Sequence, residues 1–234
     1  MNAIHWPLIS PARRIIQVCR DEGVVGLIAR VVARTVRPLV WVERVGFYDS
    51  DLSTLGADAP PVPGLPVEVR PATRAELLGR HRDALEFEFG VAPADIEQRL
   101  ARSHVAMIAL HQGQLVAMVW LAFNAQQVSE VGRVMRLRAG EFLTYNEATL
   151  PEWRGRGISP HLNQCAGDYA RRHGATRRIT WRRLGNTAAV RVATKLHDRL
   201  FAVVTTVRLF GKDRALVFGL GSTELPLLLP ADRG

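Results

Sequence analysis

The chain has 234 residues, enough for one sizeable domain with an extension, and its apolar share of 47% and charged share of 23% are those of an ordinary globular protein. No stretch of about 20 residues is apolar enough to span a bilayer, and the N-terminus lacks the pattern of a secretory signal peptide. Cys19 and Cys165 lie far apart and outside any metal-spaced set, which argues against a disulfide scaffold. We therefore expect a cytoplasmic protein.

The net charge of +9 is carried almost entirely by arginine, because Lys195 and Lys212 are the only lysines. Such a charge attracts anions, which leaves three kinds of partner open: a phosphorylated cofactor, an acidic membrane surface and a nucleic acid. A nucleic acid is the weakest of these, because basic and aromatic residues are not interleaved and no known reader motif is present.

Residues 1–59 are predicted to form a helical, basic, amphipathic N-terminal extension. Within it, residues 12–37 read as one or two helices, with Arg30, Arg34 and Arg37 on the face opposite the apolar residues. Such a helix can lie on an anionic membrane, making the protein membrane-associated, or pack on the main domain or on a second copy in a homodimer. Residues 39–48 could be a short strand or another packing segment.

The proline-rich residues 60–66 are predicted to be a linker, because this run cannot continue a helix or a central strand. The main domain is expected to span residues 67–226, followed by a tail at 227–234. Its periodicity and turn signals predict a mixed α/β order. The predicted elements are a strand at 67–70, helices at 73–82 and 93–102, a hairpin of 105–110 and 115–123, a hairpin of 135–137 and 141–149, a helix at 159–173, a strand at 178–182, a helix after Asn186, and strands at 201–209 and 215–220.

The most informative stretch is Arg154-Gly-Arg-Gly-Ile-Ser159, which joins a predicted strand to a predicted helix. Gly155 and Gly157 carry no side chain that would keep a ligand from the backbone. Ser159 is expected to cap the helix, with Pro160 at its first position. Free amides at a helix N-terminus, with arginines beside them, suit a phosphate. The alternative is a plain strand-to-helix turn, since short glycine-rich loops give many false positives.

With a second motif, Asn186-Thr-Ala-Ala189, and the flank Leu150-Pro-Glu-Trp153, this loop resembles the hallmark of the GNAT superfamily of acyl-CoA-dependent N-acyltransferases. The resemblance covers about residues 67–220. It implies an α/β (α+β) fold with a mixed, mostly antiparallel central sheet and helices on both faces, to which the helical N-terminal extension is added.

The resemblance implies an N-acyltransferase, most simply an N-acetyltransferase, that uses acetyl-CoA or another acyl-CoA as cosubstrate, without a metal. The acceptor would be the amine of a small molecule such as an amino sugar or amino-acid derivative. The loop amides would hold the pyrophosphate, the strand before the loop would pair with pantetheine, and Asn186 would lie near the thioester or act only as a helix cap. The implied cofactor-binding residues are Ala148, Thr149, Leu150, Arg154, Gly155, Arg156, Gly157, Ile158, Ser159 and Asn186.

The chain departs from the family pattern at Ala193, where many relatives have a tyrosine that protonates the departing thiolate, and at His197-Asp198, which replaces a usual Gly-Phe. Another group could serve as acid, or coenzyme A could leave as its thiolate, because a thiol pKa near 8.5 makes it a fair leaving group. The third interpretation is a non-catalytic acyl-CoA-binding or scaffold protein.

An alkylamine acceptor is mostly protonated at neutral pH and needs a general base. Glu147 is the candidate catalytic base, and Tyr145 is expected beside it because alternate residues of a strand share a face. Glu147 could instead form a structural ion pair with an arginine. The segment 181–183 could bind an acidic acceptor through its two arginines, or these could simply be solvated.

Overall fold

The computed structural model describes residues 40–53, 65–196, 198–209, 212–216 and 227–230. The helices predicted within 12–37, most of the predicted linker and the segment 217–220 lie outside these ranges. The chain divides into two compact units, one of residues 1–42 with 206–215 and one of residues 43–205 with 216–234. The core and the site described below belong to the second unit.

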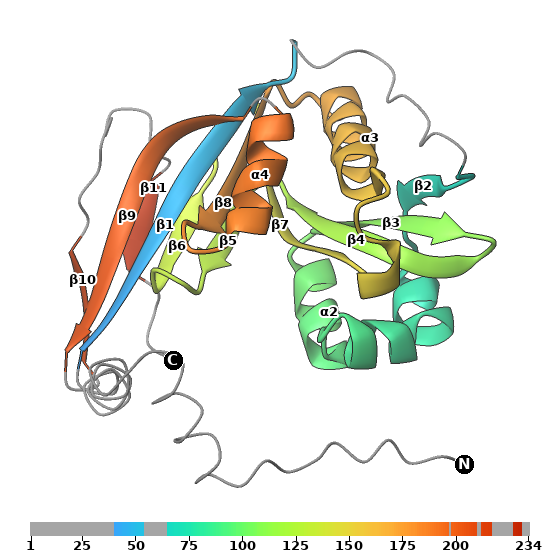
Figure 1. The fold of residues 1–234 in the computed structure, drawn as a ribbon, viewed down its shortest axis with the longest axis horizontal. Coiled ribbons are helices and arrows are strands. Elements are labelled where there is room, and N and C mark those ends of the chain that lie inside the picture. The colour runs from blue at the N-terminus through green and yellow to red at the C-terminus, as the bar shows by residue number, and fades with distance from the viewer. Residues whose placement is uncertain (1–39, 54–64, 197, 210–211, 217–226, 231–234) are drawn as a thin grey trace, which may run out of the picture. The chain divides into compact units, whose positions relative to one another are not determined.

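The main sheet has eight strands in the order β10-β9-β1-β8-β7-β4-β3-β2 (Figure 1). Among the pairings from β1 to β2, only β7 with β8 is parallel, so the predicted mixed, mostly antiparallel sheet is confirmed. The strand bounds are β1 Val40–Asp51, β2 Glu68–Pro71, β3 Val105–His111, β4 Gln114–Ala122, β7 Glu141–Thr149, β8 Arg177–Arg183, β9 Arg199–Leu209 and β10 Lys212–Leu216.

Strand β1 shows that the sheet begins before the proline-rich segment. Residues 45–51 of β1 pair with β8, so the strand interpretation of residues 39–48 is confirmed, whereas the extension placed at 1–59 took in a strand of the domain. Val45 and Phe47 are fully buried, and Gly46 between them and Tyr48 beyond them are also buried. A strand buried on both faces lacks the alternation that makes strands recognisable in a sequence.

A second, three-stranded sheet has the order β11-β6-β5 and corrects two predictions. Its strands are β5 Ala125–Val128, β6 Arg133–Arg136 and β11 Leu227–Pro230. The predicted hairpin of 135–137 with 141–149 is wrong, because β6 pairs with β5 and β11 while β7 pairs with β4 and β8. The predicted tail 227–234 contains β11. Gly140, with φ of 79°, turns the chain from one sheet into the other instead of closing a hairpin.

The helices are α2 Pro93–Ala101, α3 Ile158–Arg172 and α4 Thr187–Lys195, as predicted to within a few residues. The helix predicted at 73–82 is present, with the wide π-helical turn η1 Glu76–Arg80 in it, and a second such turn, η2 Ala84–Glu88, follows. A short 3₁₀ turn η3 covers Pro151–Trp153. The region between β2 and β3 is therefore helical but irregular.

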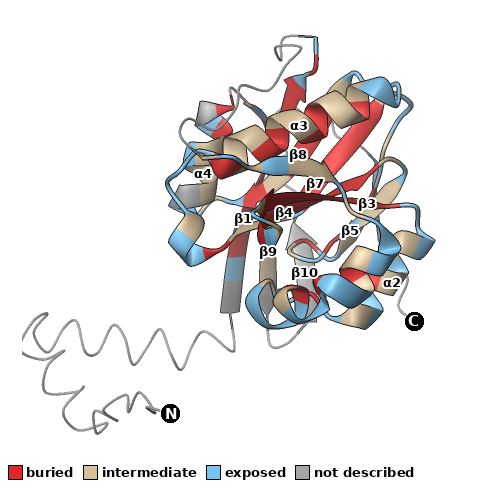
Figure 2. Ribbon diagram, turned by 90° about the vertical axis from the view of Figure 1, so that its right-hand side faces the viewer, coloured by how far each residue is buried: buried red, intermediate tan, exposed pale blue. Residues whose placement is uncertain are grey.

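The helices cover both faces of the sheet, as predicted (Figure 1). Ala106 and Ile108 of β3 face a core that contains residues of η1, η2 and α2, whereas Met107 and Ala109 face a core that contains residues of α3. Alternate side chains of β3 therefore contribute to two apolar layers, one on each face of the sheet. Figure 2 shows the buried stripe along α3 that faces the sheet. The helix residues in these cores are Leu77, Leu85 and Ile96 on the first face and Ile158, Leu162, Ala166 and Ala170 on the second.

A bulge interrupts β7 where it pairs with β4. Tyr145 lies opposite Trp120, but Asn146 and Glu147 together oppose Val119 before regular pairing resumes. Asn146 has a positive φ of 48°. A bulge of this kind adds one residue to one strand and reverses the face on which the following side chains lie.

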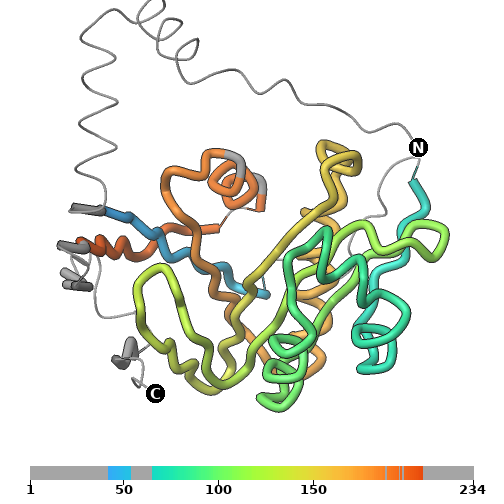
Figure 3. The backbone as a smooth tube through the Cα atoms, turned by 90° about the horizontal axis from the view of Figure 1, so that it is seen from below, coloured from blue at the N-terminus to red at the C-terminus, as the bar shows by residue number. Residues whose placement is uncertain are grey.

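The parallel strands β7 and β8 diverge at their C-terminal ends. Their pairing ends at Thr144 and Thr180, although β7 continues to Thr149 and β8 to Arg183. In Figure 3 the yellow segment that follows β7 and the orange segment that follows β8 leave the sheet in different directions. The sheet therefore presents an opening between two neighbouring strands.

Candidate functional site

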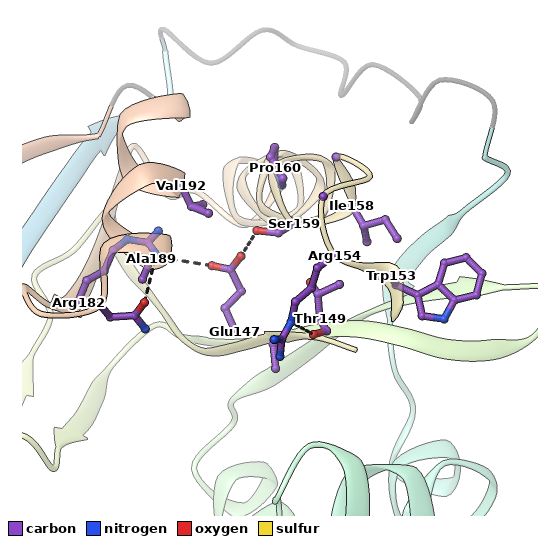
Figure 4. Close-up of a pocket in the computed structure, with 14 residues that line it drawn as sticks. Glu147, Thr149, Trp153, Arg154, Ile158, Ser159, Pro160, Arg182, Ala189 and Val192 are labelled. Carbon is purple, nitrogen blue, oxygen red and sulfur yellow. Dashed lines mark hydrogen bonds and ion pairs between the residues drawn. The ribbon is translucent and has the colours of Figure 1, made fainter. Parts of the chain in front are cut away.

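A cavity of about 530 Å³ lies where β7 and β8 diverge (Figure 4). Its wall is formed by the end of β7, the loop before α3, the first turn of α3, the end of β8 and one side of α4. The lining residues are Glu147, Ala148, Thr149, Trp153, Arg154, Gly155, Gly157, Ile158, Ser159, Pro160, Arg182, Asn186, Ala189 and Val192.

The glycine loop begins α3 earlier than expected. The N-cap is Gly157, with φ of 82° in the left-handed region, and the helix begins at Ile158. The predicted cap at Ser159 with Pro160 in first position is therefore wrong by two residues. Gly155 also has a positive φ, of 77°. Two left-handed residues in one loop explain the need for glycine there and leave the Ser159 side chain available for another partner.

The backbone of this loop presents unused donors. Within the part of the chain that the structure describes, the amides of residues 155–159 donate to no acceptor. They lie at the N-terminus of α3, where the helix dipole favours negative charge. Arg154 lines the cavity and its Nε donates to the carbonyl of Thr149 at 3.0 Å, whereas Arg156 lies against the ring of Trp153, 5.0 Å from its centroid, outside the wall. This arrangement suits a phosphate group.

The Glu147 carboxylate lies in the same cavity, between the first turn of α3 and the end of β8. Its Oε1 accepts a hydrogen bond from the Ser159 hydroxyl, and its Oε2 is 3.9 Å from Nη1 of Arg182 (Figure 4). The side chain of Glu147 is 17% exposed. The ion pair that the sequence left open is therefore present, but at a distance longer than a direct hydrogen bond.

Tyr145 does not lie beside Glu147, and the expectation that the two share a face is wrong. The bulge at Asn146 reverses the alternation, so Tyr145 points into the core on the other face. Its hydroxyl is 2.7 Å from Nδ1 of His104, and its ring stacks on that of Trp181. Burial raises the pKa of the Tyr145 hydroxyl.

The other predicted residues divide into those that line the cavity and those that do not. Leu150 and Arg156 are not in the wall, and Leu150 is buried with its amide bonded to the carbonyl of Val116. Lining residues that the sequence did not single out are Trp153, Pro160, Ala189 and Val192. The first three belong to or adjoin the motifs, which is the signal that could have found them, but nothing marks Val192. The predicted residues in the wall are Glu147, Ala148, Thr149, Arg154, Gly155, Gly157, Ile158, Ser159 and Asn186.

Asn186 caps α4 and also lies in the cavity wall. Its Oδ1 accepts from the amide of Ala189 at 3.1 Å, which makes it the cap of α4, and its side chain also lines the cavity. Ala193, at the position of the family tyrosine, is 1% exposed. Asp198, at the second departure from the family pattern, binds Arg178 in a buried ion pair.

No cluster of three or more histidine, cysteine or acidic side chains in the described ranges is arranged to hold a metal ion. Among the same residues, no helix has the length and apolarity needed to cross a bilayer.

The fold and the cavity together define a class: α+β proteins whose mixed sheet opens at one parallel strand pair, with a glycine-containing loop and a helix N-terminus at the opening. The sequence profile of the Acetyltransferase (GNAT) family matches residues 73–198, and the chain belongs to this family.

Solved structures show the same fold. A GCN5-related N-acetyltransferase from Sphaerobacter thermophilus aligns with a TM-score of 0.51 and 17% identity, over 84% of this chain and 59% of that one. A GCN5-related N-acetyltransferase from Kribbella flavida aligns with a TM-score of 0.50 and 17% identity, over 80% of this chain and 63% of that one. The chain thus spans about three fifths of the length of these relatives. No curated protein sequence matches significantly.

Proposed function

We propose that the protein transfers an acyl group, most simply acetyl, from coenzyme A to the amine of a small molecule. One observation carries the proposal: unused loop amides at a helix N-terminus and the carboxylate of Glu147 line the same cavity. The first can bind a pyrophosphate and the second can accept a proton. An amino sugar or amino-acid derivative is the proposed acceptor class.

The binding roles follow from the backbone. The amides of residues 155–159 would hold the pyrophosphate of coenzyme A. Beyond Thr144 the edge of β7 that faces β8 pairs with no strand of the described residues, so its polar groups can pair with an extended pantetheine arm. Ala148 and Thr149 lie on this stretch and in the cavity wall. The acyl group would then lie near Glu147.

Glu147 is the proposed general base. The Ser159 hydroxyl fixes Oε1, while Oε2 accepts no hydrogen bond from a described residue and can receive the amine proton directly or through water. Glu147→Gln should lower turnover by about 10²–10⁴-fold, the range for a positioned base. A decrease below threefold would contradict this role.

The test of the whole proposal is calorimetric titration of the full chain with acetyl-CoA. The double variant Arg154→Glu, Gly157→Trp should lose binding, because it adds a negative charge and a large side chain to the loop. Gly132→Trp, in a turn where an added Cβ meets nothing within 4 Å, is the matched control and should bind normally. Absence of binding by folded wild-type protein, with acetyl-CoA or longer acyl-CoAs, would refute the acyltransferase proposal.

A non-catalytic acyl-CoA-binding protein is the second candidate, and the absence of the family tyrosine at Ala193 favours it. Thiol release from acetyl-CoA over a panel of small amines separates the two. Binding without thiol release above the rate of a protein-free control, for every amine tested, would favour the binding protein.

Contact of residues 12–37 with a membrane remains a proposal, because these residues lie outside the described ranges. Charge reversal of Arg30, Arg34 and Arg37 should abolish sedimentation with anionic vesicles. Equal sedimentation of the wild type and the variant would refute membrane contact through this face.

A further inference from the structure

Four charged side chains meet beside the cavity. Arg178 and Arg182 come from β8, Glu147 comes from β7, and Asp198 follows α4. The side chains of Arg178 and Asp198 are 1% and 0% exposed, and that of Arg182 is 8% exposed. Charges this deeply buried are costly unless they are paired and hydrogen-bonded, so each needs a reason to be there.

Arg178 has a structural reason. Its Nη2 donates to Oδ1 of Asp198, its Nε donates to Oγ of Ser50 at 3.1 Å, and its Nη1 donates to Oδ1 of Asn163 at 3.5 Å. Every nitrogen of this guanidinium has a partner, and Arg178 is not part of the cavity wall. It ties β8 to β1, α3 and the segment after α4.

Arg182 is held differently. Its Nη1 is 3.9 Å from Glu147 and its Nη2 is 3.8 Å from Asp198, both longer than the roughly 3 Å of a direct hydrogen bond. Its Nε is buried and has no partner. Within the described residues its guanidinium therefore makes no hydrogen bond, yet it lines the cavity. A buried guanidinium with unused donors at a cavity wall is a candidate functional group.

The reaction proposed above is accelerated by a group that stabilises the departing sulfur, and this inference rests on that proposed function. The position of the family tyrosine holds a buried alanine, Ala193, which offers no proton. We propose that Arg182 is the catalytic residue that takes its place, by stabilising coenzyme A as a thiolate. Arginine stays protonated at neutral pH, so it acts through its charge and its N–H donors, without giving up a proton.

The step balances as follows. The amine nitrogen forms a bond to the thioester carbonyl carbon, whose oxygen takes the electron pair of the C=O bond. The carbonyl reforms and the C–S bond breaks, so the sulfur leaves with its electron pair as a thiolate beside Arg182. The proton lost by the amine goes to Glu147. Glu147 then gives this proton to the thiolate, or to solvent when coenzyme A leaves as its thiolate, and either route regenerates the carboxylate.

The spectroscopic test measures the pKa of the coenzyme A thiol bound to the full-length protein, from the ultraviolet absorbance of the thiolate. Coenzyme A that lacks its sulfur provides the baseline. Glu147 lines the same cavity and Asp198 lies 3.8 Å from Nη2 of Arg182, so both charges would raise the thiol pKa, whereas Arg182 should lower it. In the wild type we expect a pKa at least one unit below about 8.5, which is a tenfold rise in the ratio of thiolate to thiol.

Arg182→Gln should bind coenzyme A within about threefold of the wild type, because the loop amides are intact, but the thiol pKa should return to about 8.5 or above. Arg183→Gln is the matched control, because this substitution removes the same charge from the neighbouring residue. It is 58% exposed and pairs with Glu43 at 2.6 Å outside the cavity. This control should keep the wild-type thiol pKa.

Arg182→Lys keeps a positive charge at the site and should retain at least half of the shift in thiol pKa, so the proposal can be tested even if the glutamine variant does not fold. Equal thiol pKa values in the wild type and Arg182→Gln, or a complete loss of the shift in folded Arg182→Lys, would overturn the role of Arg182 while leaving acyl-CoA binding intact. Failure of the wild type to bind coenzyme A at all would overturn the proposed function itself, and this inference with it.

Discussion

The two faces of the sheet differ sharply around the bulge of β7, although only Asn146 separates the residues that mark them. On one face Tyr145 lies among Trp120, Trp181 and His104, in a buried aromatic cluster. On the other face Glu147 lies in an open cavity beside Ser159 and Arg182. The first face is closed by packing, whereas the second is lined with unused donors.

The two faces therefore differ in role: one contributes to the stability of the fold and the other to binding and catalysis. Apolar burial stabilises the fold in proportion to area, which suits the aromatic face. Free amides and a guanidinium without hydrogen-bond partners contribute little to stability and are available to a ligand. Substitutions on the aromatic face should therefore change the free energy of unfolding, and substitutions in the cavity should change binding and turnover.

The largest expected effect is on the aromatic face. Trp120 is 0% exposed, so Trp120→Ala should lower the free energy of unfolding by about 3–5 kcal/mol, measured by urea denaturation. Trp153→Ala, at the cavity rim, is the matched control and should cost less than half as much. A loss of stability as large for Trp153 as for Trp120 would remove the contrast between the faces.

The next effect is on binding. Gly157→Val places a β-branched residue at φ of 82°, at a backbone cost of about 1–2 kcal/mol, and changes the direction of the loop amides. Acetyl-CoA affinity should fall at least tenfold by calorimetry. Gly132→Val, at φ of 60° in a distant turn, carries comparable strain but should leave affinity unchanged. Equal losses of acetyl-CoA affinity in both variants would show that the loss follows from lower stability and not from a change in the loop.

A smaller effect is expected for the hydroxyl of Tyr145. Tyr145→Phe leaves Nδ1 of buried His104 without its partner and should cost about 1–3 kcal/mol of stability. Turnover of amine acceptors should stay within threefold, because this hydroxyl is bonded on the face away from the cavity. A hundredfold loss of turnover with normal stability would instead restore Tyr145 as a catalytic group.

The sequence predicted the sheet class, α2, α3, α4 and the loop because each has a local signal: a hydrophobic period, a cap or a glycine pair. It left residues 39–48 open between a strand and another packing segment, because the residues of β1 are buried on both faces and so do not alternate. It also placed Tyr145 and Glu147 on one face, because a bulge depends on the pairing with β4 and leaves no local mark except Asn146, a residue that tolerates positive φ. The position of the Arg182 guanidinium could not be predicted either, because it depends on Glu147 and Asp198, which are distant in the sequence.

The smallest expected effect is a pH dependence of the aromatic face. Burial lowers the pKa of the His104 imidazole, and the positive charges of Arg102 and Arg99 lower it further. The folded protein therefore binds this proton less readily than the unfolded chain, whose histidine titrates near 6.5.

The contribution of neutral His104 to the free energy of unfolding should be complete above about pH 6.5 and decrease as the pH falls through the lower pKa of the folded state. Urea denaturation between neutral and mildly acidic pH should show this loss. His104→Gln should show a smaller loss, to which buried His81 still contributes because burial lowers its pKa as well. An unchanged pH dependence in His104→Gln would mean that His104 does not change its protonation on unfolding. The aromatic face would then contribute to stability independently of pH, as an apolar core does.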